Sequence, residues 1–275
     1  MSQSDSTSAS SVARAPHPPH ADPTAVKAIV LKKTEGAFKP GQVYHAVPLV
    51  ELPVPIPGPD QVLVKIIAAV SSPRPSAQLQ LTPNLQAYNH RDVFLRQSLY
   101  PGLIFDAPGK PSVMGADCAG IVVSPSHPLT NKPVIVHSAV HWESDADGPD
   151  GTEPFGILGA VSATQGRGTF AEYIVVGAKD VVACPEHFMQ RGMEGWSEAA
   201  AFPLGGLTAY RCVNAHSGPV SRTLIRLCRA VFTKANVQSG QNVLITGIGG
   251  GVAITALQYC IALGESPLHW CTLSA

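Results

Sequence analysis

Charged side chains are scarce in this sequence of 275 residues, and neither sign dominates. They make up 14% of the chain, with Lys plus Arg equal to Asp plus Glu at 19 each. A protein that binds nucleic acid needs a basic surface against the phosphates, so this balance predicts no nucleic-acid partner. Apolar runs long enough to cross a bilayer are also lacking, and we expect no membrane partner.

Cysteine pairs and metal-ligand patterns are lacking as well. The six cysteines include no C-x-x-C pair and no group with zinc-ligand spacing. Two histidines and two aspartates share a loop rich in Pro and Gly, at His137, His141, Asp145 and Asp147. Their spacing favours a solvated loop over a metal site. This use of cysteine fits a reducing compartment, so we expect a cytoplasmic protein.

Composition separates an N-terminal tail from a β-rich region. Residues 1–24 are rich in Ser, Pro and His and have little to bury, so a disordered tail is expected. Residues 25–185 contain short strand patterns separated by long loops, which favours an all-β barrel over βαβ repeats. The expected strands are Ala25–Leu31, Gln61–Ala68, two within Val113–Val123, Thr169–Val176 and Val181–Ala183.

From residue 186 the pattern becomes helical and then alternates strand and helix. Ser197–Tyr210 is rich in Ala, with Ser197 as the expected N-cap. Further on, the buried strand Asn242–Thr246 leads through a glycine turn into an apolar helix. This order is the first unit of a doubly wound parallel sheet, so residues 186–275 predict an α/β domain after the β domain.

The glycine turn carries the strongest single signal. Glycines let a backbone approach a pyrophosphate, and the following helix offers free N–H groups and a positive dipole end. The spacing is G-x-x-G-G-V-A instead of the strict G-x-G-x-x-G, and a simple turn is the alternative. Because a strand precedes it and a helix follows, we predict a phosphate site. Its expected residues are Thr246, Gly247, Gly249, Gly250, Gly251 and Val252.

Two other motifs carry no chemistry when taken alone. Asn89-His90-Arg91-Asp92 is typical of a polar turn at a helix start, and Gly115–Gly120 is typical of a strand with a bend. A G-x-S-x-G elbow is absent, so nothing supports a hydrolase.

Together and in order, these segments resemble the medium-chain dehydrogenase/reductase superfamily from about Ala25 to Gly264. The matching segments are AVKAIVL, QVLVKI, NHRD, GADCAGIV, GTFAEYIVV, WSEAAAFPLGGLTAYR and SGQNVLITGIGGGVA. The resemblance implies a GroES-like β-barrel domain over residues 25–185 and a Rossmann domain over residues 186–275. It also implies a nicotinamide-dependent oxidoreductase that forms a homodimer when intact.

The sequence resembles the zinc-free branch of that superfamily, which includes quinone and enoyl reductases. Zinc alcohol dehydrogenases have a cysteine at the position of His90 and Gly-His-Glu at Gly115-Ala116-Asp117. Without a thiolate and an imidazole there, no site remains for Zn²⁺. The missing ligands imply no zinc. Separately, the resemblance to this branch implies NADP(H) as the cofactor, with NAD(H) as the alternative.

The resemblance also places an active site between the two domains. The residue matching Thr208 borders the nicotinamide, and those matching Asn89 and Asp92 line the substrate side. These three are the expected catalytic residues, and Thr208 is also expected to contact the cofactor. Hydride passes to a small-molecule quinone, enone or related carbonyl compound, with Tyr88, His90 and water as alternative proton donors.

Three segments depart from the superfamily pattern. Residues 70–86 and 212–229 interrupt stretches that are continuous in relatives, and residues 265–275 diverge where a second Rossmann strand is expected. Because codons at every boundary can encode splice signals, we interpret them as retained short introns; genuine loops are the alternative. The expected result is an incomplete Rossmann domain whose strand Asn242–Thr246 is unpaired and exposed. A non-catalytic fragment is therefore the alternative function.

The intron interpretation predicts the mature transcript. Its mRNA should join Ala69 directly to Ala87, and Arg211 directly to Ala230, both in frame. RT-PCR across the two junctions measures this. If every product retains the extra bases, the segments are genuine loops.

Overall fold

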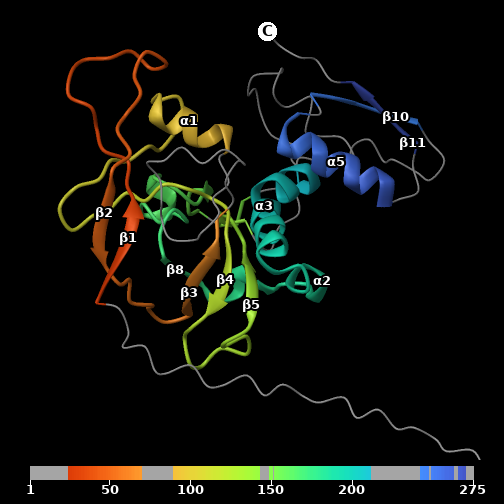
Figure 1. Ribbon diagram of the computed structural model, residues 1–275. Helices are drawn as coiled ribbons and strands as arrows, with labels where there is room; N and C mark the ends of the chain where they lie inside the picture. Colours follow the sequence, from red (N-terminus) through yellow and green to blue (C-terminus); the bar gives the residue numbers. More distant parts are fainter. Residues whose placement is uncertain are drawn as a thin grey trace, which may run out of the picture.

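A computed structural model of the protein describes residues 24–69, 89–142, 149–150, 152–211, 242–247, 249–262 and 266–270 (Figure 1). The expected tail up to residue 23 and both expected inserts lie outside these residues. The described part divides into a β domain and an α/β unit, in the order that the sequence predicted.

The β domain is built on a five-stranded antiparallel sheet with the order β8-β3-β4-β5-β9. Along β3, Val62, Val64 and Ile66 alternate with more exposed residues, which is the two-residue period of a strand with one face in the core. The strands are β3 (Gln61–Ala68), β4 (Ala119–Val122), β5 (Pro133–Val136), β8 (Tyr173–Gly177) and β9 (Val181–Ala183).

Two antiparallel ribbons complete the domain, but the described strands do not close into a barrel. In one ribbon β1 (Ala25–Ile29) pairs with β2 (Leu49–Pro53), and in the other β6 (Ala139–Val140) pairs with β7 (Gly156–Ile157). Isolated bridges and single backbone hydrogen bonds, such as Ile29 N–H to the Phe170 carbonyl, join β1 to neighbouring segments, and no continuous ladder forms among the described residues. Ile29 still packs into the core shared with the large sheet. The strands thus surround one core without a closed ladder.

The longest described helix, α3 (Gly192–Arg211), begins earlier than the sequence predicted. Ser197 is not its N-cap, because the Ser197 hydroxyl donates within the helix to the carbonyl of Met193 at 2.8 Å. Packing explains the earlier start, because Ala199 packs with Ala68 of β3 and Ala119 of β4, and Trp196 packs against the same cluster. No described helix is both long and apolar enough to span a membrane.

Shorter helices fill the connections of the β domain. They are α1 (His90–Arg96), η1 (Ser162–Thr164), η2 (Ala178–Asp180) and α2 (Glu186–Met189). The helix α1 begins at the NHRD motif, as expected for a polar turn at a helix start.

The α/β part is one βαβ unit, and it corrects the expectation of an unpaired strand. β10 (Asn242–Thr246) is followed by α5 (Gly251–Ala262) and pairs in parallel with β11 (Ser266–Trp270). The divergent end therefore supplies a strand that satisfies one edge of β10. The expected exposure remains, since Leu244 on β10 is 62% exposed and Ile261 on α5 is 57% exposed.

The helix α3 joins the two parts, and Figure 1 shows it between the large sheet and α5. Its Ala199 and Ala200 pack with Ala68 and Ala119 of the β domain. Further along the same helix, Ala209 packs in a cluster with Ile245, Ala256 and Cys260. One helix thereby fixes the position of the βαβ unit against the β domain.

Candidate functional site

The N-terminus of α1 is held by two residues of the NHRD motif. Asn89 is the N-cap, with the extended backbone that this position requires. The Asp92 carboxylate accepts a hydrogen bond from the backbone N–H of Asn89 at 3.1 Å. Asp92 is 5% exposed, so its carboxylate lies inside the domain and acts on the backbone of Asn89. The Asn89 side chain in turn faces the backbone N–H of Asp92 in a capping box, which leaves its Nδ2 group for another partner.

That side chain reaches Asp117, a residue that the sequence did not single out as functional. The Asn89 amide donates from Nδ2 to the Asp117 carboxylate at 2.9 Å. Asp117 follows Gly115, which has a φ of +88° and faces the Phe170 ring so closely that a Cβ would lie 2.2 Å from it. Only glycine fits there. The bend at Gly115 thus brings Asp117 beneath the start of α1.

The second oxygen of Asp117 binds α3. The backbone N–H of Leu204 donates to Asp117 Oδ1 at 2.7 Å. Leu204 directly follows Pro203, which lies inside the helix. A proline disrupts the helical hydrogen-bond ladder around it, so a neighbouring N–H can take a partner outside the helix. Asp117, which is 2% exposed, therefore connects α1 to α3 through two hydrogen bonds.

Arg91 fixes the position of α1 on the opposite side. Its guanidinium donates to the carbonyls of Ile157, Leu158 and Gly159 at 2.7–3.1 Å. It also lies over the Tyr100 ring, 4.4 Å from the ring centroid. Arg91 is 8% exposed, so these contacts take the place of the hydrogen bonds that its guanidinium would make to water. The buried guanidinium holds α1 and the loop after β7 together.

Burial shifts the acid–base behaviour of both carboxyl groups. Loss of water raises the pKa of Asp117 to about 7, against the lowering effect of its bonds from Asn89 and Leu204. Loss of water also raises the pKa of Asp92 to about 6, partly offset by backbone N–H groups and the charge of Arg91. Both groups therefore hold a proton more tightly in the folded chain than in the unfolded one.

This shift predicts how stability changes with pH. A raised folded-state pKa gives stability that is fully present below about pH 4 and is lost as pH rises through about 6 and 7. Removing one of the two carboxyl groups should therefore reduce the loss of stability that accompanies rising pH. Across pH 4–8 the unfolding free energy of wild type should fall relative to that of Asp117→Asn, by a few kcal/mol at about 1.4 kcal/mol per pKa unit. Urea denaturation of both proteins measures this, and parallel pH profiles would contradict the assignment.

The positions matched to zinc ligands carry no such ligands. Ala116 is fully buried and has no donor atom, and His90 is an exposed residue whose ring packs near that of Phe94 at 5.8 Å. Within the described ranges, no group of three His, Cys, Asp or Glu side chains is placed to hold a metal. Asp145, Asp147 and Tyr88 fall outside these ranges.

The glycine turn between β10 and α5 leaves room for a ligand. Gly247 has a φ of +68°, and the Gly250 N–H donates to its carbonyl at 3.1 Å. A Cβ placed on Gly249 or Gly251 would meet no described atom within 4 Å. Packing inside the described chain therefore does not require glycine at these two positions. A bound pyrophosphate would require glycine there, because it needs close access to the backbone.

Thr208 lies on α3 near this turn. It is half-buried and stands one helical turn after Gly205, where a Cβ would lie 3.6 Å from the backbone of Gly251. Val252 packs partly into the cluster around Ala209. The helix that carries Thr208 thus contacts both Asp117 in the β domain and the glycine turn. Of the turn residues, Ile248 and the side chain of Thr246 are outside the described structure.

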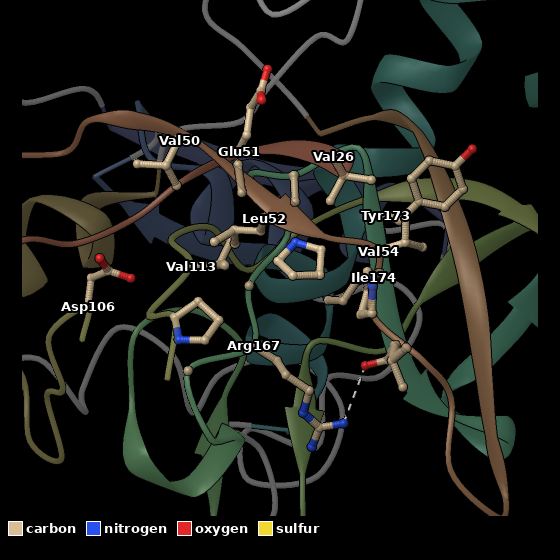
Figure 2. A pocket seen from close by; sticks show the side chains of 18 of the residues that line it. Val26, Val50, Glu51, Leu52, Val54, Asp106, Val113, Arg167, Tyr173 and Ile174 are labelled. Carbon is tan, nitrogen blue, oxygen red and sulfur yellow. Dashed lines mark hydrogen bonds between the residues drawn. The ribbon is translucent and has the colours of Figure 1, made fainter. Parts of the chain in front are cut away.

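A separate apolar pocket of about 910 Å³ lies elsewhere on the β domain. Figure 2 shows it between the ribbon of β1 and β2 and strand β8, with Val26, Leu52 and Ile174 on its walls. Asp106 and Arg167 are among its charged lining residues, and Arg167 donates to the carbonyl of Val175 at 3.3 Å. No residue predicted to bind cofactor or substrate lines this pocket.

The sequence is similar to that of several oxidoreductases. It is 35% identical over 240 residues to the zinc-type alcohol dehydrogenase-like protein YogA of Leptosphaeria maculans, covering 85% of this chain and 53% of that protein. It is 28% identical over 232 residues to a crotonyl-CoA reductase of Streptomyces avermitilis, covering 82% and 45%. No protein-family model matches the chain.

The fold is similar to that of solved alcohol dehydrogenases. An NAD-dependent alcohol dehydrogenase superposes with a TM-score of 0.59 and 25% identity, over 88% of this chain and 57% of that one. The chain spans about half the length of the curated relatives that it matches.

Proposed function

We propose that this chain, a member of the medium-chain dehydrogenase/reductase superfamily, belongs to an NAD(P)H-dependent oxidoreductase that transfers hydride to a quinone, an enone or a related carbonyl compound. The observation that carries the proposal is the connection through α3. The buried Asp117 hydrogen bonds both Asn89 and this helix, which packs against the glycine turn. Asn89 on the expected substrate side and the glycine turn on the expected cofactor side are thereby connected through Asp117 and α3.

The residues of the chain supply binding and orientation. Backbone N–H groups around Gly249, Gly250 and Gly251 would hold the cofactor pyrophosphate. Thr208 would contact the nicotinamide, and the Asn89 amide would hold the substrate. Asp92 would act through Asn89, because its carboxylate binds the Asn89 backbone. When bound, the nicotinamide supplies the hydride, and positioning is the contribution of the protein.

The proposed substrate is an activated double bond or a quinone, reduced with NADPH in preference to NADH. Similarity to a crotonyl-CoA reductase supports an enoyl compound. The resemblance to zinc-free reductases supports the quinone and the NADP(H) preference. We further propose a cytoplasmic homodimer.

A kinetic assay of the active protein tests this function. NADPH consumption should depend on an enone or quinone acceptor, and Thr208→Val or Asn89→Ala should lower kcat/KM by about 100-fold, the cost of misplacing reactants. Thr34→Val changes a half-buried threonine in the β domain, away from α3; it is the matched control for Thr208→Val and should leave kcat/KM unchanged. Oxidation of primary alcohols with no enone or quinone reduction would reject the proposed substrate class.

Zinc independence is a separate prediction. His90 and Ala116 replace the thiolate and imidazole that a catalytic zinc needs, so the purified protein should contain well under one Zn²⁺ per chain. Reductase activity should also survive dialysis against a chelator. Elemental analysis that finds about one Zn²⁺ per chain would show that other residues bind the metal.

The alternative function is a non-catalytic fragment. Exposed Leu244, Ile254 and Ile261 favour it, since apolar side chains on β10 and α5 need a covering layer. A fragment would bind no nicotinamide cofactor. NADPH titration of the 275-residue chain beside an extended protein distinguishes the two functions, because tight saturable binding by the 275-residue chain would reject the fragment.

A further inference from the structure

We propose that Asp117 is a positioning residue that orients the Asn89 amide and ties it to α3. The inference rests on the proposed function, in which Asn89 holds the substrate and α3 carries Thr208. Neither the GADCAG motif nor the resemblance assigned Asp117 a role. The structure assigns one through two hydrogen bonds, from residues 28 and 87 positions away in the sequence.

The chemistry of a carboxylate fixes which way the Asn89 amide points. Both Asp117 oxygens accept hydrogen bonds, Oδ2 from the Asn89 amide and Oδ1 from the Leu204 N–H, so the Nδ2 side of the amide faces Asp117. The carbonyl oxygen of Asn89 is then turned away from Asp117. Because Asp92 occupies the Asn89 backbone N–H, the backbone and the side chain of Asn89 are both held. A substrate therefore meets an amide of fixed polarity.

The second hydrogen bond relates this amide to the cofactor side. The Leu204 N–H reaches Asp117 next to Pro203, and Thr208 follows one turn later on the same helix. Gly205 of that helix packs against Gly251 of the phosphate turn. The substrate-holding amide and the cofactor-binding turn are thus linked through one side chain and one helix.

The cost of burying a polar group supports a specific role for this carboxyl group. Asp117 is 2% exposed, and a buried polar group is expensive unless it is hydrogen-bonded. A neutral amide at this place would carry one acceptor group and one donor group. Its oxygen could replace only one of the two carboxylate oxygens, so one of the two donors, Asn89 or Leu204, would face its NH2 group. An aspartate suits this position because each of its two oxygens accepts a hydrogen bond from a different donor.

A double-mutant cycle in the active protein tests the role. Asp117→Asn should lower kcat/KM by about 30-fold, while the NADPH dissociation constant changes less than about threefold. In the Asn89→Ala background, Asp117→Asn should cause almost no further loss, because Asp117 acts through Asn89. Asp180→Asn removes another buried carboxylate of the β domain, which accepts from the Gly177 N–H, and serves as the matched control.

The outcomes decide between positioning and general support of the fold. Losses in kcat/KM that multiply in the double variant, or equal losses for Asp180→Asn, would overturn the proposal. So would an unchanged kcat/KM in Asp117→Asn.

Hydrogen exchange tests the hydrogen bond between Asp117 and Leu204 independently of any enzymatic activity. In the 275-residue chain, Asp117→Ala should speed exchange of the Leu204 amide at least about tenfold, because that N–H loses a charged acceptor. The amide of Val64 in the central sheet reports global folding and should exchange as in wild type. An unchanged Leu204 rate would refute the link, whereas absent reductase activity alone would refute only the proposed function.

Discussion

Replacing Arg91 with methionine is expected to lower the unfolding free energy of the β domain by about 3–5 kcal/mol. Methionine keeps much of the apolar volume but donates no hydrogen bond. The carbonyls of Ile157, Leu158 and Gly159 would lose their partner, two of them in fully buried contacts. The cation over the Tyr100 ring would also be lost. Urea denaturation followed by circular dichroism measures the change.

Arg191→Met is the matched control for this substitution. Arg191 is an exposed arginine that pairs with Glu194 and Glu198 on the surface of α3. Exposed pairs contribute little, so this variant should unfold almost as wild type does. If both variants lose similar stability, the buried contacts of Arg91 do not hold α1 in place.

Sequence patterns predicted those helices and strands that are determined by residues close together in the sequence. The strand pattern of Gln61–Ala68 identified β3, and the polar turn Asn89-His90-Arg91-Asp92 identified the start of α1. The strand, glycine turn and helix from Asn242 onward formed as one unit for the same reason. In each case the pattern and the structure depend on the same short segment.

Features that depend on distant contacts were not predicted. The early start of α3 follows from packing on β3 and β4, which overrides the N-cap preference of Ser197. The pairing of β11 with β10 was missed because Ser266–Trp270 contains a proline and lacks strand alternation. Asp117 was missed because its partners are far away in sequence. Pro203 inside a helix was the available signal that a backbone N–H would seek such a partner.

Cofactor binding is expected to depend on how much of the Rossmann domain accompanies the glycine turn. In the described part, two parallel strands carry the turn, and Leu244 is 62% exposed. A complete domain holds both nucleosides with further strands. The 275-residue chain alone should therefore bind NADPH negligibly. A spliced and extended protein should bind at about micromolar level, or roughly −8 kcal/mol.

Titration of NADPH by fluorescence, on the extended protein and its Gly249→Val variant, tests the central claim most directly. The extended protein should saturate at micromolar NADPH. The variant should fold normally, because a Cβ at this position meets no described atom within 4 Å. It should bind NADPH at least about tenfold more weakly, because valine blocks the pyrophosphate. Equal affinity of the two proteins, or no binding by either, would contradict the assignment of this turn to a nicotinamide cofactor.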